Sequence, residues 1–126
     1  MRLGIGKVRL GVRDQERARE FWVDTMGCSI ATDEKYGDER WLEVALHDNT
    51  VIILELNEDG PADAPEGQPN TALFLSCDDV DAAWKTLSDN GVMFATEPTD
   101  SPWGGSGRWA LFEDSEGNRI PLQTKQ

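Results

Sequence analysis

The chain has 126 residues, 38% of them hydrophobic, and its 24 acidic and 12 basic side chains give a net charge of −12. This length suits one compact domain with a real core, and no apolar run approaches the roughly 20 residues that a membrane-spanning helix needs. Nucleic acid is an unsuitable partner because phosphate binding requires a basic surface, whereas a cationic small molecule would be attracted.

The first ten residues, MRLGIGKVRL, lack the long apolar segment and the cleavage site of a signal peptide, so we expect a cytoplasmic protein. The two cysteines, Cys28 and Cys77, show neither a zinc-binding spacing nor a disulfide pattern, and we expect ordinary reduced thiols. Cys77 is in phase with the apolar residues of its strand and should point into the core. Cys28 follows Gly27 at a helix end and should be more exposed.

The first half of the chain predicts a strand, a helix and three further strands. Residues 7–12 alternate between polar and apolar side chains, which is typical of a half-buried strand. Asp14 is a typical N-cap for a helix that ends at Gly27. Further strands are predicted at residues 29–35, 40–46 and 50–56, the last two joined by a turn at His47-Asp48-Asn49.

The second half repeats this order. Residues 57–69, NEDGPADAPEGQP, are acidic and rich in Pro and Gly, and we interpret them as a linker. A strand is then predicted at 71–77, and Asp79 is the expected N-cap of a helix that ends at Gly91. Three further strands are predicted at 93–98, 107–113 and 118–124.

The repeat is visible in short motifs as well. Arg40-Trp41 and Arg108-Trp109 begin matching strands, and Asp14 and Asp79 precede matching helices. We therefore predict a single α+β domain of two βαβββ modules, residues 1–56 and 70–126, joined by the linker 57–69 and packed as a pseudo-symmetric pair.

Three segments in this order, VRLGVRDQERAREFW, DDVDAAWKTLSDNGV and FEDSEGNRIPL, resemble the vicinal oxygen chelate superfamily of glyoxalases, extradiol dioxygenases and bleomycin-resistance proteins. The resemblance covers nearly the whole chain. It implies that each module curls its mixed sheet into a trough, that the troughs form a central cavity, and that the protein is a homodimer. Because members include lyases, oxygenases and binders that catalyse nothing, the resemblance does not determine the function.

The resemblance also implies where a metal would bind. Metal-dependent members take one ligand from the first and one from the fourth strand of each module, which here are Lys7, Glu55, Ala72 (or Thr71 after a one-residue slip) and Pro121. Only Glu55 is a good ligand, because the ammonium of Lys7 repels a cation and Ala72 and Pro121 have no side-chain donor. His47, the single histidine, lies in a turn. We expect no metal and no other cofactor, as in metal-free members similar to bleomycin-resistance proteins.

Strand alternation indicates which side chains face the trough rather than the helices. Aromatic rings with a few polar groups are typical of a small-molecule site. The expected ligand-binding residues are Lys7, Arg9, Trp41, Glu43, Ile53, Glu55, Phe74, Trp109, Leu111, Pro121 and Gln123, with Trp103 on the adjoining loop.

Alternatives remain open for several of these residues. Trp41 and Trp109 line a pocket, or they belong to the core or a subunit interface. Lys7 and Glu55 bind a ligand, or they pair with each other as an internal salt bridge.

Two further features concern the remaining tryptophans. Trp22 and Trp84 lie on apolar helix faces and are expected in the core. The loop SPWGGSG, residues 101–107, is either a flexible lid that carries Trp103 or a long hairpin loop without a function.

Two functions are compatible with these residues. The first is metal-independent binding of a hydrophobic or cationic aromatic compound, such as an antibiotic, which the protein would sequester. The second is catalysis by a glyoxalase-like lyase, an isomerase or a dioxygenase, with Glu55 as a general base or as a metal ligand. The expected partners are a small molecule and a second copy of the chain, with no nucleic acid and no membrane.

Overall fold

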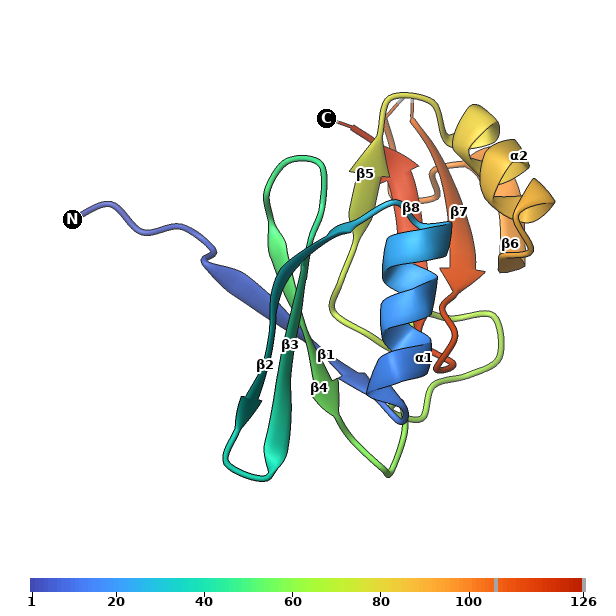
Figure 1. The fold of residues 1–126 in the computed structure, drawn as a ribbon. Coiled ribbons are helices and arrows are strands. Elements are labelled where there is room, and N and C mark those ends of the chain that lie inside the picture. The colour runs from blue at the N-terminus through green and yellow to red at the C-terminus, as the bar shows by residue number, and fades with distance from the viewer. Residues whose placement is uncertain (106, 126) are drawn as a thin grey trace. The chain divides into compact units, whose positions relative to one another are not determined.

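The computed structural model describes residues 1–105 and 107–125. They divide into two compact units, Met1–Gly60 and Pro61–Gln126, which run from blue to green and from green to red in Figure 1. The described part of each unit contains one four-stranded mixed sheet and a helical segment. The expected α+β class is confirmed.

The first unit contains every element that its sequence predicts. The elements are β1 (Lys7–Val12), α1 (Gln15–Arg19), η1 (Glu20–Thr25), β2 (Ser29–Tyr36), β3 (Glu39–Ala45) and β4 (Val51–Leu56). The strand order is β1-β4-β3-β2, with β1 parallel to β4 and the other pairs antiparallel. The helix widens after Arg19 into a π-helix, in which Met26 N donates to Phe21 O at 3.0 Å.

The core of the first unit lies on one face of its sheet. Trp22 and Ala18 from the helical segment are fully buried. Gln15 begins α1 and its side-chain amide donates to Arg40 O at 3.0 Å and to Leu54 O at 2.9 Å, so the helix is tied to β3 and β4. The alternating apolar residues of the strands complete this core: Leu10, Val12, Leu42, Val44, Ile52 and Leu54.

The second unit repeats this arrangement in the part that the structure describes. Its elements are β5 (Leu75–Cys77), α2 (Val80–Asp89), β6 (Met93–Asp100), β7 (Arg108–Glu113) and β8 (Arg119–Thr124). The strand order is β5-β8-β7-β6, again with one parallel pair, β5 and β8. Both predicted N-caps are confirmed: Asp14 Oδ1 accepts from Arg17 N at 2.9 Å and Asp79 Oδ1 accepts from Ala82 N at 3.0 Å.

The strand predicted at 71–77 is wrong at its beginning, since β5 starts only at Leu75. The preceding residues contact β8 through side chains instead of a backbone ladder. Asn70 Oδ1 accepts from Arg119 N at 2.7 Å, and Thr71 Oγ1 donates to Arg119 O at 3.4 Å. These side-chain hydrogen bonds take the place of the pairing that a strand would make, as polar residues with short side chains often do.

The prediction that Cys28 is more exposed than Cys77 is wrong. Cys28 is buried, with 7% of its surface exposed, whereas Cys77 is only half-buried; both thiols are free. Cys28 N donates to Trp22 O at 2.9 Å, which holds Cys28 against the end of the helical segment instead of in solvent. Trp22 is in the core as expected, but Trp84 on α2 is only half-buried.

Two further points concern the loops and the helices. The turn predicted at His47-Asp48-Asn49 is confirmed: Leu46 N donates to Thr50 O at 2.9 Å, and Asn49 adopts a φ of 68°. In the loop SPWGGSG, Ser106 lies outside the described residues. None of the described helices has the length and apolar character to cross a membrane.

Candidate functional site

In the first unit, the sheet face opposite the core carries a buried carboxylate. Lys7 Nζ donates to Glu43 Oε2 at 2.6 Å, and Glu43 is only 3% exposed. The hydrogen bond from Lys7 is the main reason that the pKa of Glu43 lies below its ordinary value, with smaller contributions from Thr32 and Trp41. Glu43 is therefore ionised at neutral pH, and its carboxylate is bound to Lys7.

A second ion pair lies on the same face, closer to solvent. Arg9 donates to Glu55 Oε2 from Nε at 3.1 Å and from Nη2 at 2.7 Å, with the Arg9 side chain 70% and the Glu55 side chain 42% exposed. The alternative pairing of Lys7 with Glu55 is wrong. In the parallel ladder, Lys7 lies opposite Val51 and Gly11 lies opposite Glu55, so Lys7 and Glu55 are near opposite ends of the paired strands.

The two ion pairs involve two of the four positions at which metal-dependent members of the family carry their ligands. Glu55 is held by Arg9 and Lys7 is held by Glu43, while Ala72 and Pro121 carry no side-chain donor. Within the described ranges, no three His, Cys, Asp or Glu side chains form a group that could hold an ion. His47 is exposed in its turn. The residues at these positions do not fit a metal.

In the second unit, the sheet face opposite α2 carries an aromatic cluster, which we define as Phe74, Trp103 and Trp109. The ring centroids of Phe74 and Trp103 lie 6.0 Å apart at an interplanar angle of 67°, and those of Trp103 and Trp109 lie 5.4 Å apart at 58°. Phe74 is 49% and Trp103 is 50% exposed, so this cluster is not part of the core.

The remaining expected residues of the second unit surround Trp109. Gln123 lies opposite Trp109 in the β7–β8 ladder, and Pro121 lies opposite Leu111. Leu111 and Pro121 are fully buried, whereas Trp109 and Gln123 are half-buried. Leu111 and Pro121 therefore support the face on which Trp109 lies and present no surface of their own.

The expected residues of the first unit share one face as well. Across the strands, Arg9 lies opposite Ile53, and Ile53 lies opposite Glu43. Ile53 is buried with Glu43, whereas Trp41 on β3 is 40% exposed. The alternative that Trp41 belongs to the core is therefore wrong.

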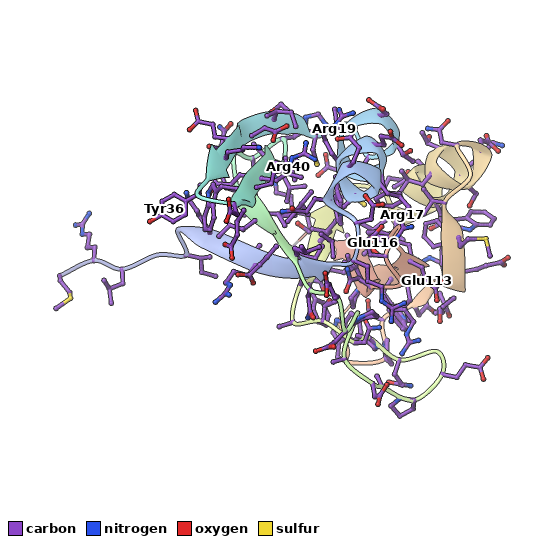
Figure 2. The ribbon with its side chains drawn as sticks, turned by 60° about the horizontal axis from the view of Figure 1, so that its bottom comes forward. Arg17, Arg19, Tyr36, Arg40, Glu113 and Glu116 are labelled. Carbon is purple, nitrogen blue, oxygen red and sulfur yellow. The ribbon has the colours of Figure 1, made fainter. Side chains whose placement is uncertain are left out.

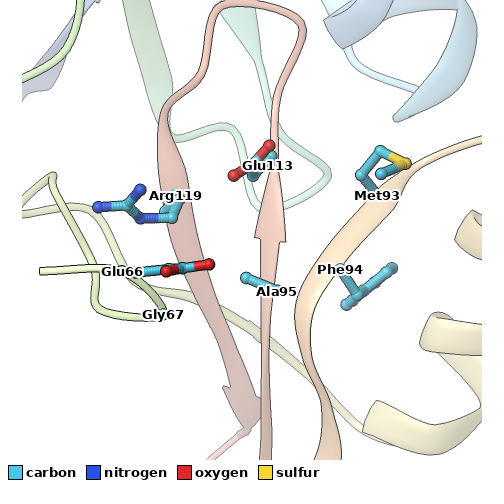
Figure 3. A pocket seen from close by; sticks show the side chains of 7 residues that line it. All are labelled: Glu66, Gly67, Met93, Phe94, Ala95, Glu113 and Arg119. Atoms are coloured by element: carbon cyan, nitrogen blue, oxygen red, sulfur yellow. The ribbon is translucent and has the colours of Figure 1, made fainter.

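A pocket that the sequence analysis missed lies in the second unit (Figure 3). It encloses about 250 Å³ and is lined by Glu66, Gly67, Met93, Phe94, Ala95, Glu113 and Arg119. Met93, Glu113 and Arg119 lie opposite one another on neighbouring strands. Glu66 and Gly67 come from the segment interpreted as a linker, which has no periodicity that would place it against a sheet.

A hydrogen-bonded anchor brings this segment to the sheet. Arg119 Nε donates to Gln68 O at 2.6 Å, and Arg119 Nη2 donates to Ala64 O at 3.3 Å and to Pro65 O at 3.4 Å. The guanidinium of Arg119 is thus directed at backbone carbonyls of the linker. Sequence periodicity carries no signal for such side-chain to backbone contacts.

Comparison with known proteins places nearly the whole chain in one protein family. The model of the Glyoxalase/Bleomycin resistance protein/Dioxygenase superfamily matches residues 4–122. The uncharacterized protein YetH of Bacillus subtilis (strain 168) is 32% identical over 123 residues, which cover 94% of this chain and 96% of YetH.

Solved structures of similar proteins cover the chain equally well. TnmS3, an antibiotic binding protein from Streptomyces sp. CB03234, is 33% identical with a TM-score of 0.76, covering 100% of this chain and 99% of TnmS3. A superfamily member from Sphaerobacter thermophilus DSM 20745 is 29% identical with a TM-score of 0.79, covering 98% of both chains.

Proposed function

Because this chain belongs to the glyoxalase/bleomycin resistance protein/dioxygenase superfamily, we propose that it binds and sequesters a hydrophobic or cationic aromatic small molecule, such as an antibiotic, without a metal. The observation that carries this proposal is the aromatic cluster of Phe74, Trp103 and Trp109. Its rings meet at tilted angles and leave about half of Phe74 and of Trp103 in solvent. A planar ligand gains stacking area there.

The charges of the chain favour a cationic ligand over an anionic one. The net charge of −12 attracts cations over long range, and an aromatic face binds a cation through its quadrupole. In the first unit, by contrast, Glu43 and Glu55 are already paired with Lys7 and Arg9. The ligand would therefore be held by ring contacts and long-range attraction, with no new salt bridge at those positions.

Similarity supports the same class of ligand. TnmS3 is described as an antibiotic binding protein and is 33% identical to this chain over its whole length. The homodimer that is common among relatives of this length is also part of the proposal, since the family completes its cavities with facing modules.

Tryptophan fluorescence tests the proposal directly, because the chain contains five tryptophans. We expect saturable quenching by at least one member of a panel of cationic aromatic antibiotics, with the ligand recovered unchanged. Trp103→Ala and Trp109→Ala should each raise the Kd by more than about tenfold, as truncation of a central aromatic contact does. Trp84→Phe is the matched control, because Trp84 lies on α2 away from the cluster and should leave the Kd unchanged.

The enzymatic alternative makes a different set of predictions. A base at position 55 would have to leave its three hydrogen bonds with Arg9, which lie at 2.5, 2.7 and 3.1 Å. Turnover of a small oxo acid that survives a chelator and is lost in Glu55→Gln would overturn the binding proposal. Stoichiometric iron, nickel, zinc or manganese in protein purified without chelator would overturn its metal-independent part.

A further inference from the structure

The hairpin of β2 and β3 presents two aromatic side chains on the sheet face opposite the core. Tyr36 lies opposite Glu39 in the ladder, and Trp41 lies opposite Glu34. Ladder partners point to the same face, and so do residues that are two apart in one strand. These four residues, which we call the hairpin patch, therefore share one surface. The rings lie on one diagonal of the patch and the carboxylates on the other.

Both rings of the hairpin patch are accessible to a ligand. Tyr36 is 77% and Trp41 is 40% exposed. Neither ring contacts another aromatic ring among the described residues. Figure 2 shows Tyr36 projecting outward from the first unit. Diagonal neighbours in a sheet lie roughly 7–8 Å apart, so the two rings are close enough to contact one small group between them.

The ring of Trp41 is oriented by the buried carboxylate beside it. Lys7 makes the largest contribution to the lowered pKa of Glu43, and hydrogen bonds from Thr32 and Trp41 add to it. The indole N–H is the single donor of a tryptophan side chain, so this edge of the Trp41 ring is directed at Glu43. Glu43 is itself held by Lys7 at 2.6 Å. A ligand that binds Trp41 therefore meets a ring that is already ordered.

The carboxylates of the hairpin patch carry negative charge that no neighbour on the hairpin offsets. Glu34 and Glu39 make no side-chain hydrogen bond or ion pair within residues 1–105 and 107–125. Lys35 and Arg40 lie opposite each other in the ladder and, by alternation, point to the other face. On that face Arg40 is bound to Asp33 at 2.8 Å.

The cations of β1, which lie on the same face as the hairpin patch, are also paired. Lys7 is bound to Glu43. Arg9 donates to both carboxylate oxygens of Glu55. Neither pair leaves a cation for the glutamates of the hairpin patch. The patch thus combines two accessible rings with two carboxylates that lack a partner in the part of the chain that the structure describes.

We propose that the hairpin patch binds the methylated ammonium group of a small molecule, with its methyl groups against Tyr36 and Trp41 and its charge between Glu34 and Glu39. Aromatic rings attract such a cation through their quadrupoles, and the methyl groups add apolar contact. A neutral or anionic ligand would leave both carboxylates without a partner. This site lies in the first unit, and the inference goes beyond the proposed function, which rests on the aromatic cluster of the second unit.

The size and the donor set of the hairpin patch favour this occupant over other cations. Four side chains on two strands match one ammonium group, whereas a protein partner needs about 800 Å² of surface on each side. A metal ion fits poorly, because no three His, Cys, Asp or Glu side chains of the described residues form a metal-binding group. Charge complementarity and ring contacts together therefore select a small organic cation.

Choline, which carries a trimethylammonium group, is the probe for the first test. Its uncharged analogue, in which carbon replaces nitrogen, is the control ligand. We expect choline to cause a saturable shift of the Trp41 indole N–H resonance in NMR spectra, with a Kd at least about tenfold lower than that of the analogue. Equal affinity for the two compounds, or no saturable shift of the Trp41 resonance, would overturn the proposal.

Removal of each ring tests the aromatic contacts. Tyr36→Ala and Trp41→Ala should each raise the Kd for choline by about two- to fivefold, measured from the choline methyl protons by ligand-observed NMR. Because Tyr36 is 77% exposed, Tyr36→Ala should keep the wild-type melting temperature. It therefore gives an answer even if Trp41→Ala does not fold. A Tyr36→Ala variant that binds choline as the wild type does would contradict the site.

Removal of the two charges tests the carboxylates against the general charge of the protein. Glu34→Gln/Glu39→Gln should raise the Kd for choline by about tenfold at low salt. The matched control is Glu20→Gln/Asp24→Asn, which removes the same charge from exposed residues of η1, on the core side of the same sheet. The control should change the Kd by less than about twofold. An equal loss in both variants would show that net charge, and not the hairpin patch, attracts choline.

The two proposals fail on different results. Trp103→Ala/Trp109→Ala should leave the Kd for choline unchanged. If this variant loses choline while Trp41→Ala retains it, choline binds at the aromatic cluster and the hairpin patch is not the site. If no antibiotic quenches the tryptophans but choline shifts the Trp41 resonance, the proposed function is wrong and the hairpin patch stands.

Discussion

Arg40 and Arg108 make equivalent contacts in the two units: each guanidinium joins the first turn of its own helix to the outer strand of its own sheet. Arg40 donates to Asp33 on β2 through two bonds of 2.8 Å and to Glu16 on α1 at 3.1 Å. Figure 2 shows Arg40 next to Arg19, which shares Glu16 with it.

The second unit repeats these contacts with different acids. Arg108 donates to Asp81 on α2 at 2.8 and 3.0 Å and to Asp100 on β6 at 3.3 Å. The neighbouring tryptophans, Trp41 and Trp109, lie on the opposite face because side chains alternate along a strand. The repeated Arg-Trp pair thus has two structural roles, one on each face of the sheet.

Replacing these arginines should destabilise the protein unequally. Arg40→Met should lower the melting temperature by about 2–4 °C, since the Arg40 side chain is only 28% exposed and makes three ionic bonds. Arg108→Met should have a smaller effect, because Arg108 and its partners are more exposed. Thermal unfolding monitored by circular dichroism checks the order, with Arg2→Met as a control. An equal loss at both positions would show that burial does not govern these contacts.

The Lys7–Glu43 pair should give the protein a pH-dependent stability. Because the pKa of folded Glu43 lies below its ordinary value of 4.5, its contribution is complete above that value and is lost as the pH falls through the folded pKa. Glu43→Gln should cost about 1 kcal/mol at pH 7 and much less near pH 3. Urea unfolding at both pH values measures the difference. Glu34→Gln, at an exposed residue of β2, is the control, and its effect on the free energy of unfolding should not depend on pH in this way.

The turn between β7 and β8 should depend on one buried carboxylate. Asp114 Oδ1 accepts from Glu116 N at 2.8 Å and from Asn118 N at 2.9 Å, and Oδ2 accepts from Asn118 Nδ2 at 2.9 Å. Burial raises the pKa of Asp114 above its ordinary value, and these three donors oppose that rise. Asp114→Ala should therefore cost about 2–4 kcal/mol, because buried donors lose their acceptors. Denaturant unfolding measures this loss. Asp63→Ala, at an exposed residue of the linker, is the control and should leave the free energy of unfolding nearly unchanged.

The two thiols should react at different rates. Burial raises the pKa of Cys28 to about 11 and also raises that of the half-buried Cys77. At pH 8 an aromatic disulfide reagent should modify Cys77 first, while Cys28 reacts only after denaturation, because the thiolate is the reactive form and must be accessible. Mass spectrometry of the partly modified protein identifies the site. Prior modification of Cys28 in the native state would contradict the burial order.

Sequence reasoning succeeded where the signal is local. The caps at Asp14 and Asp79 were predictable because a short carboxylate satisfies a backbone N–H of the next turn. It failed where a distant residue decides the outcome. Asn70 and Thr71 bond to β8 and shorten β5, and Lys7 pairs with Glu43 through a strand register that no local pattern specifies.

The sequence by itself determined the order of elements in the two units, the N-caps and the apolar face of β1, β3 and β4, because capping and the alternation of side chains depend on near neighbours. Only the tertiary structure decided which charges pair, that Phe74, Trp103 and Trp109 meet, and that Arg119 holds Glu66 beside Glu113 at a pocket. Those contacts join residues far apart in the chain. Their distances follow from strand register and loop paths, which the whole fold sets.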